Sequence, residues 1–216
     1  MTLSTPMPQT NGVPAPGFAE PVHQAQLTFR AVLDAMARPT RPVTVPGITG
    51  PDGLTPAGAA LLLTLCDDAT PLWLDDRLRS CADEVATWLA FHTGTPIMDR
   101  PGKASFAVVS SPAALPELGS FAEGTDEAPH TSATVIVLDP VGTTGPAFTA
   151  DGPGFQRPLD WAAPALPSDF ADQWAGNHAR FPRGVDLIIA GTETVVGLPR
   201  TTRLTARPGI RSIEEN

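Results

Sequence analysis

The sequence predicts a single α/β domain, in which a mixed β-sheet lies between helices in a three-layer α/β/α arrangement. The first observation is that helical patterns alternate along the chain with strand-like runs. The second is that residues 105–111 and 133–139 are rich in valine and isoleucine without polar alternation, which is typical of strands covered on both faces. The third is a short turn between the last two runs, which makes them an antiparallel hairpin and the sheet mixed.

The 216 residues divide into a leader, one domain and a tail. Residues 1–17 are mainly small and polar residues and proline, and we expect a mobile leader. Residues 18–205 form the α/β domain, and residues 206–216 form a polar tail. The leader lacks the charged and apolar regions of a secretory signal, and no stretch approaches the ~20 apolar residues of a membrane span. We therefore expect a soluble, cytoplasmic protein.

Helical patterns dominate the first half of the domain. Residues 21–38 form an amphipathic helix that Pro39 stops, and residues 55–66 form a nearly all-apolar, buried helix with Thr55 as its N-cap. The apolar residues at helical spacing in the first helix are Val22, Ala25, Phe29, Val32, Leu33 and Met36. The other elements of this half are extended segments at residues 42–47 and 71–75 and a helix at residues 80–94.

The second half of the domain is richer in strands. The two apolar strands at residues 105–111 and 133–139 are separated by a long loop with room for one helical turn. Then follow an extended segment at residues 145–155 that ends in a Gly-Pro-Gly turn, a helix at residues 168–180 capped by Ser168, and the hairpin strands at residues 185–191 and 194–199.

The charge of the chain excludes some partners. Its formal net charge of -9 argues against nucleic-acid and anionic-membrane binding, because both need a basic surface. Arginine is nearly the only cation, since Lys103 is the one lysine.

The familiar catalytic and metal motifs are absent from the sequence. There is no P-loop and no G-x-S-x-G elbow. Cys66 and Cys81 lack metal-ligand spacing and are expected to be ordinary buried thiols. The histidines are too scattered for a metal site, and they are His23, His92, His130 and His178. We therefore expect no metal.

Two acidic pairs leave two interpretations open. Asp67 and Asp68 follow a buried helix, and Asp75 and Asp76 follow a strand. Acids at the carboxyl ends of strands can hold Mg²⁺ near phosphates. The alternative, which we favour, is that they are turn and cap residues.

The arginines around the terminal hairpin are the main candidate site. Arg183 precedes the first strand, Arg200 and Arg203 follow the second, and Thr201 and Thr202 lie between them. Such an edge can bind a phosphate or a partner carboxylate, because the guanidinium fork matches both. The alternative is that the arginines bind nothing, and that their charge only prevents this strand edge from pairing with other chains and aggregating. If the edge binds, replacing Arg200 or Arg203 with alanine should weaken binding about tenfold and leave stability nearly unchanged.

Four segments resemble one known family. They are GFAEPVHQAQLTFRAVLDAMARP (residues 17–39), LCDDATPLWL (65–74), SATVIVL (132–138) and FPRGVDLIIAGTETVVGLPRTTR (181–203). In this order they are similar to the PhnH family, a subunit of the bacterial carbon-phosphorus lyase system. The likeness runs from about residue 18 to about residue 204.

The resemblance implies an accessory subunit. With PhnG, PhnI and PhnL it would be needed to transfer the ribose triphosphate moiety of ATP to methylphosphonate, and PhnJ would later break the carbon-phosphorus bond. ATP or a phosphonate would then be a ligand of the complex. The alternative is an independent transferase or hydrolase acting on a small phosphorylated substrate.

The resemblance also implies a fold similar to a reduced pyridoxal-phosphate-dependent transferase, and a homodimer in isolation. Pyridoxal phosphate needs a lysine for its internal aldimine, and only Lys103 is present. We therefore expect no pyridoxal phosphate.

Overall fold

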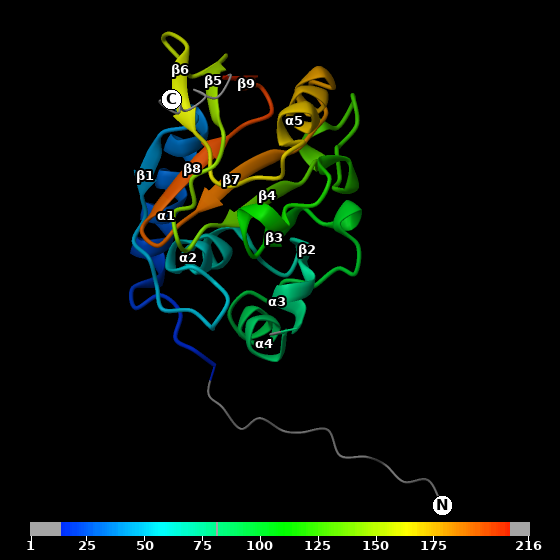
Figure 1. Ribbon diagram of the computed structural model, residues 1–216. Coiled ribbons are helices and arrows are strands. Elements are labelled where there is room, and N and C mark those ends of the chain that lie inside the picture. Colours follow the sequence, from blue (N-terminus) through cyan, green and yellow to red (C-terminus); the bar gives the residue numbers. More distant parts are fainter. Residues whose placement is uncertain (1–13, 81, 208–216) are drawn as a thin grey trace, which may run out of the picture.

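The computed structural model describes residues 14–80 and 82–207 and contains a six-stranded mixed sheet (Figure 1). Its strands are β1 (Pro42–Thr44), β2 (Leu72–Leu74), β3 (Phe106–Val109), β4 (Thr134–Leu138), β7 (Asp186–Ala190) and β8 (Thr194–Leu198). The order across the sheet is β1-β8-β7-β4-β3-β2. Strands β2, β3, β4 and β7 are parallel, whereas β8 is antiparallel to both of its neighbours. The predicted mixed sheet and terminal hairpin are confirmed.

Both faces of this sheet are buried, which explains why its strands lack polar alternation. Along β4, Ile136 and Leu138 belong to one apolar core, whereas Val135 and Val137 belong to the other. The first core is closed by α1 (Pro21–Ala37), α2 (Pro56–Leu65) and α4 (Ala82–His92). The second core is closed partly by α5 (Phe170–Ala179).

A small antiparallel sheet completes the second face. It consists of β5 (Ala147–Asp151), β6 (Leu159–Ala162) and β9 (Arg203–Ala206), in the order β6-β5-β9. Phe148 and Trp161 point from it into the second core, where Phe148 contacts Phe170 of α5 edge to face. Only the first of these strands was predicted. The second outer layer is therefore a helix with a small sheet, not helices alone as an α/β/α arrangement would have.

Some helix ends lie where the sequence predicts them, and others do not. The Thr55 side chain accepts a hydrogen bond from Gly58 N at 3.0 Å, which confirms it as the cap of α2. The helix predicted at residues 80–94 begins earlier, as α3 (Asp76–Ser80) followed by α4. The predicted Ser168 cap is wrong, because α5 starts at Phe170 with Asp169 as its N-cap. Among the described helices, none has the length and apolar character needed to cross a membrane.

The long loop between β3 and β4 contains more structure than the one helical turn for which the sequence left room. It holds three short 3-10 helices, η2 (Pro112–Ala114), η3 (Leu118–Ser120) and η4 (Pro129–Thr131). A fourth, η1 (Pro101–Lys103), precedes β3.

The ordered fold extends past both expected boundaries. The Ala15 carbonyl accepts a hydrogen bond from Trp88 Nε1 at 2.8 Å and lies 3.0 Å from His92 Nε2, so part of the expected leader packs on α4. At the other end, Arg207 N donates to the Ala147 carbonyl at 3.0 Å, beside β5. The rest of the expected leader and tail lies outside the described residues.

Helix α1 buries a different face from the one that its spacing predicts. Val32 is buried, but Val22, Phe29 and Leu33 are 75%, 47% and 53% exposed. The other buried residues of the helix are small, and they are Thr28, Ala31 and Ala35.

The reason lies in β8. A Cβ atom added to Gly197 would come within 2.5 Å of the Ala35 carbonyl oxygen, so the helix backbone rests directly on the strand. Only a small residue fits where the two backbones meet, and the helix therefore turns Val22, Phe29 and Leu33 outward.

This close approach makes Gly197 sensitive to substitution. Gly197→Ala forces α1 away from β8, and we expect it to lower the free energy of unfolding by about 1–3 kcal/mol, as overpacking does. Gly176→Ala is the matched control, because the nearest atom to its added Cβ is Arg180 Nη1 at 3.7 Å. Removing a helix-interior glycine should raise stability by about 0.5–1 kcal/mol. Urea unfolding of both variants measures the difference, and equal midpoints would contradict the close contact.

Candidate functional site

The arginines of the hairpin lie at the amino edge of the parallel strands. Arg200 follows β8, and its partner Asp186 is the first residue of β7. Open α/β sheets bind ligands at the opposite, carboxyl edge. The predicted site is therefore not at the edge where this class of sheet usually places its chemistry.

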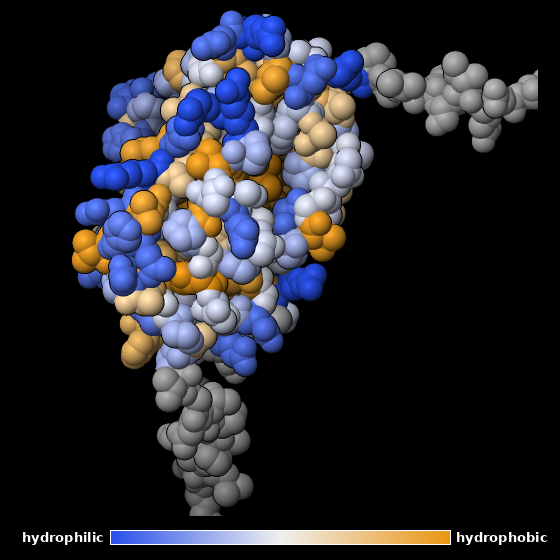
Figure 2. Space-filling view, turned by 90° about the vertical axis from the view of Figure 1, so that its left-hand side faces the viewer, coloured by the Kyte–Doolittle hydropathy of each residue, from blue (hydrophilic) through white to orange (hydrophobic). Residues whose placement is uncertain are grey.

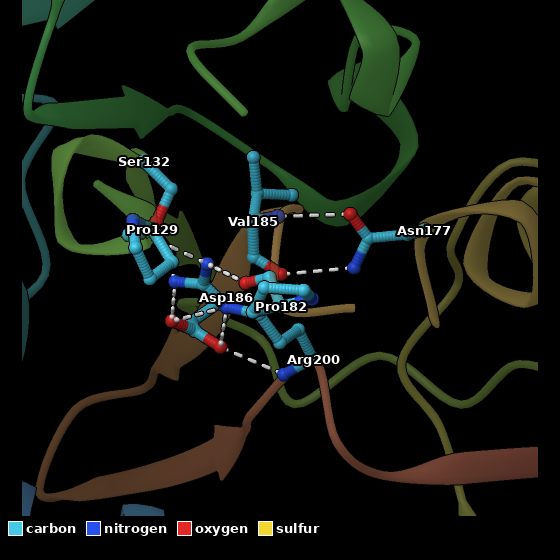
Figure 3. A network of polar contacts seen from close by, with 7 residues as sticks. All are labelled: Pro129, Ser132, Asn177, Pro182, Val185, Asp186 and Arg200. Carbon is cyan, nitrogen blue, oxygen red and sulfur yellow. Dashed lines mark hydrogen bonds and ion pairs between the residues drawn. The ribbon is translucent and has the colours of Figure 1, made fainter. Parts of the chain in front are cut away.

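The Arg200 guanidinium is enclosed by internal acceptors (Figure 3). Its Nε lies 3.2 Å from both carboxylate oxygens of Asp186, and its Nη2 donates to Asp186 Oδ2 at 2.5 Å and to the Ser132 hydroxyl. Its Nη1 donates to the carbonyls of Pro129 at 3.2 Å and Pro182 at 3.1 Å. The Arg200 backbone N–H also donates to Asp186 Oδ1, at 2.7 Å. All five guanidinium N–H groups are thus used inside the protein.

This saturation changes the role of Arg200. Its side chain is only 13% exposed, and that of Asp186 is 17% exposed. With its charge neutralised and its donors occupied, the guanidinium offers nothing to a phosphate. Instead it joins η4, the segment before β7 and the turn after β8, and we assign it to the fold and not to ligand binding.

Asn177 binds the segment just before β7, and it was not identified as a structural residue from the sequence. It is fully buried on α5, and its amide donates to the Val185 carbonyl at 2.9 Å and accepts from Val185 N at 2.8 Å (Figure 3). Gly184 lies against this amide with a φ of 115°, and a Cβ there would come within 2.7 Å of Asn177 Oδ1. The only sequence signal is a polar amide near the end of a helix, followed by a glycine before the next strand.

The other two arginines are exposed and point to different partners. Arg183 Nε lies 3.2 Å from Asp126 Oδ1, and the two side chains are 41% and 71% exposed. Arg203 Nη2 donates to Asp151 Oδ2 at 2.8 Å, across the register of β9 and β5 in the small sheet. The pKa of Asp151 is lowered by the hydrogen bond from Arg203 and by that from the Gly152 backbone N–H.

The two threonines serve the turn after β8. Thr202 is fully buried, and its carbonyl accepts a hydrogen bond from Trp174 Nε1 at 2.8 Å. Its hydroxyl is buried with no hydrogen-bond partner in the described part of the chain. Thr201 is half-buried. The structure therefore does not arrange the five predicted residues around one ligand.

The acids at and near the carboxyl edge act as caps. The Asp75 carboxylate accepts from Leu78 N at 2.9 Å and Ser110 N at 2.7 Å. Asp67 accepts from Ala69 N at 3.1 Å and from the Thr70 hydroxyl. Within residues 14–80 and 82–207, no three histidine, cysteine or acidic residues are grouped to hold a metal ion. These contacts support the cap interpretation over Mg²⁺ binding.

Cys66 does not supply a reactive thiol. Cys66 is buried, and burial, with a smaller contribution from the charge of Asp67, raises the pKa of its thiol to about 12. The thiol is therefore neutral near pH 7. Cys81 lies outside the described residues.

Lys103 does not fit the lysine of a pyridoxal phosphate site. It is exposed on η1, which precedes β3, and so it lies toward the amino edge of the sheet. An internal aldimine needs an amine aimed into the binding site. The side chains present therefore do not fit this cofactor.

A groove of about 280 Å³ lies between η3 and α5. Its charged lining residues are Glu117, Asp169, Asp172 and Arg180. Arg180 is already paired, because its Nη2 lies 2.9 Å from Glu123 Oε1. The groove is therefore acidic and repels phosphate.

The saturated ion pair predicts a large stability effect at Arg200. Arg200→Ala leaves the Asp186 carboxylate buried without its partner, which typically costs about 3–5 kcal/mol. Arg203→Ala, the matched control, removes an exposed ion pair worth about 0–1 kcal/mol. Chemical denaturation of both variants measures the difference. Equal losses of stability would show that Arg200 is a surface charge, as the sequence alone suggested.

Comparison with known proteins agrees with the resemblance seen in the sequence. Residues 16–205 match the family described as bacterial phosphonate metabolism protein (PhnH). A protein of Rhizobium meliloti (strain 1021), named alpha-D-ribose 1-methylphosphonate 5-triphosphate synthase subunit PhnH, is 40% identical over 195 residues, which are 87% of this chain and 93% of that protein. A putative C-P lyase subunit protein HtxG of Stutzerimonas stutzeri is 29% identical over 182 residues, covering 83% and 85% of the two chains. The chain therefore belongs to the PhnH family of bacterial phosphonate metabolism proteins.

Proposed function

We propose that the chain is an accessory subunit of a carbon-phosphorus lyase complex in phosphonate catabolism. It would be required with PhnG, PhnI and PhnL for transfer of the ribose triphosphate moiety of ATP to methylphosphonate, and would meet PhnJ in the same assembly. The observation that carries this proposal is the 40% identity, over almost the full length of both proteins, to a named subunit of that synthase.

The side chains support a role without chemistry of its own. The best placed cation, Arg200, is saturated by internal acceptors, and the groove at α5 is acidic. The described acids at the carboxyl edge are caps. A chain with these features contributes surfaces and architecture to a complex, and ATP or the phosphonate would be bound with the help of other subunits.

Arg183 and Arg203 remain proposed contacts for an acidic partner surface or a phosphate-bearing ligand. Their side chains are 41% and 60% exposed, so an incoming carboxylate can approach the guanidiniums beside Asp126 or Asp151 at low cost. Arg200, Thr201 and Thr202 would support this edge from within by holding the turn after β8. Because Arg203 belongs to the small sheet and Arg183 to the segment before β7, each arginine would make its own contact.

We also propose that the fold is a reduced form of the pyridoxal-phosphate-dependent transferase fold, without its cofactor. The mixed sheet with one antiparallel strand, β8, is compatible with this. The exposed position of Lys103 supports the loss of the cofactor. A cytoplasmic location would follow from a role in an ATP-dependent complex, because ATP is available in the cytoplasm.

The purified chain should be inactive alone. When the chain is incubated with ATP and methylphosphonate, we expect no release of adenine, because its sequence contains neither a P-loop nor a G-x-S-x-G elbow. Adenine should appear when PhnG, PhnI and PhnL are added, and should disappear when this chain is left out. Reactions without methylphosphonate are the control, with adenine measured by chromatography. Turnover by the chain alone would favour an independent transferase or hydrolase.

In isolation we expect a homodimer. Two-fold dimers are the commonest oligomers, and β6 and β9 are edge strands of the small sheet, a kind of strand that can pair with another chain. Light scattering at micromolar concentration should give twice the mass of one chain. A monomer mass across that range would reject the dimer and leave the family assignment unaffected.

A further inference from the structure

Helix α1 carries most of the large apolar side chains that the described part of the molecule leaves in solvent. Four of the seven lie on this helix of 17 residues. They are Val22, Leu27, Phe29 and Leu33, whereas the other three, Phe91, Val141 and Phe181, belong to separate segments. Single exposed apolar residues are normal on a protein surface, but a group on one element indicates an interaction site.

Three of the four form one continuous stripe. Val22, Phe29 and Leu33 are spaced by seven and four residues, which places them on one face of the helix along roughly 16 Å. We call these three residues the α1 stripe. Figure 2 views the side of the molecule where Figure 1 places α1 and β1, and apolar surface emerges there between polar side chains. The stripe exists because the face of α1 that packs on the core is the one centred on Thr28, Ala31 and Ala35, which turns the residues of the stripe outward.

An arginine accompanies the stripe. Arg30 is exposed, follows Phe29 directly and lies one helical turn before Leu33. It forms no ion pair with any carboxylate of the described residues, whereas Arg38 of the same helix is paired with Asp34. In a chain of net charge -9, a cation left open beside an apolar stripe is a specific complement for a carboxylate on another molecule.

A second copy of the chain is a poor occupant for this surface. An antiparallel pairing of two α1 helices that covers both stripes puts the two Arg30 side chains on the same side of the interface, about 8 Å apart along the axis. Two like charges on the same side of one interface disfavour this pairing.

We infer that the α1 stripe, with Arg30 beside it, is the docking surface for a different subunit of the complex, which presents an apolar face bearing a carboxylate. This inference rests on the proposed function. The apolar contact supplies most of the affinity, and the arginine fixes the register, since a carboxylate must meet it for the stripe to be covered.

The test is co-purification. This chain is expressed together with the other carbon-phosphorus lyase subunits, one of which carries a tag, and the proteins recovered with the tagged subunit are identified by mass. The double variant Phe29→Glu with Leu33→Glu should reduce the recovered chain at least tenfold. Val141→Glu is the matched control, because Val141 is 82% exposed on another segment, and it should assemble like the parent. Both changes lie on the surface, so both variants should melt at the temperature of the parent. Arg30→Glu should weaken assembly, and Arg30→Lys should largely preserve it.

The outcomes separate this inference from the proposed function. If the parent assembles and the double variant assembles equally well, the docking surface is wrong and the function stands. If the double variant still assembles but turns a dimeric parent into a monomer, the stripe is a self-association surface and the inference is also wrong. If the parent itself does not co-purify, the proposed function fails, and the inference fails with it.

Discussion

The direct contact of α1 with β8 determines how the first helix packs on the main sheet and which of its residues reach the surface. It depends on Gly197, because any side chain there would collide with the backbone at Ala35. The strand in turn binds β1 on one side and β7 on the other, so one glycine connects the first helix to the last hairpin of the sheet. The contact also decides which residues of α1 are buried. Small residues meet the strand, and three of the large apolar ones, Val22, Phe29 and Leu33, are left on the surface.

The amino edge of the sheet is held together by polar contacts as well as by apolar packing. Arg200 joins three segments that are far apart in sequence, and Asn177 attaches α5 to the start of β7. Each of these buried polar groups is satisfied, which is the condition for keeping them in a folded protein. The edge is therefore rigid where Arg200 holds it and adjustable where the exposed pairs of Arg183 and Arg203 lie. A subunit that presents surfaces to several partners benefits from both properties.

Patterns among neighbouring residues predicted most helices and strands, but they could not predict contacts between segments that are distant in sequence. The Thr55 cap, the buried strands and the hairpin follow from neighbouring residues, so they were visible in the sequence. The face of α1 that is buried depends on Gly197, about 160 residues away, and helical spacing alone cannot show it. Strands β6 and β9 are short and carry exposed charges, and each pairs only with β5. Arg200 was noticed because arginines surround the terminal hairpin, but its acceptors include Pro129, Ser132 and Pro182, and no local pattern connects them.

The pairing of β1 with β8 has a consequence for how the chain is made. Strands β2, β3 and β4 are neighbours in both sequence and space, so they can associate while the ribosome is still translating the rest. Strand β1 and helix α1, although synthesised first, have no sheet to pack on until β8 emerges near the end of translation. Helix α1 can meet α2 early, but the side that packs on β8 stays uncovered for most of synthesis. Closing that long loop is the slow, non-local step of folding, and a chaperone or an early-arriving partner would act during this interval.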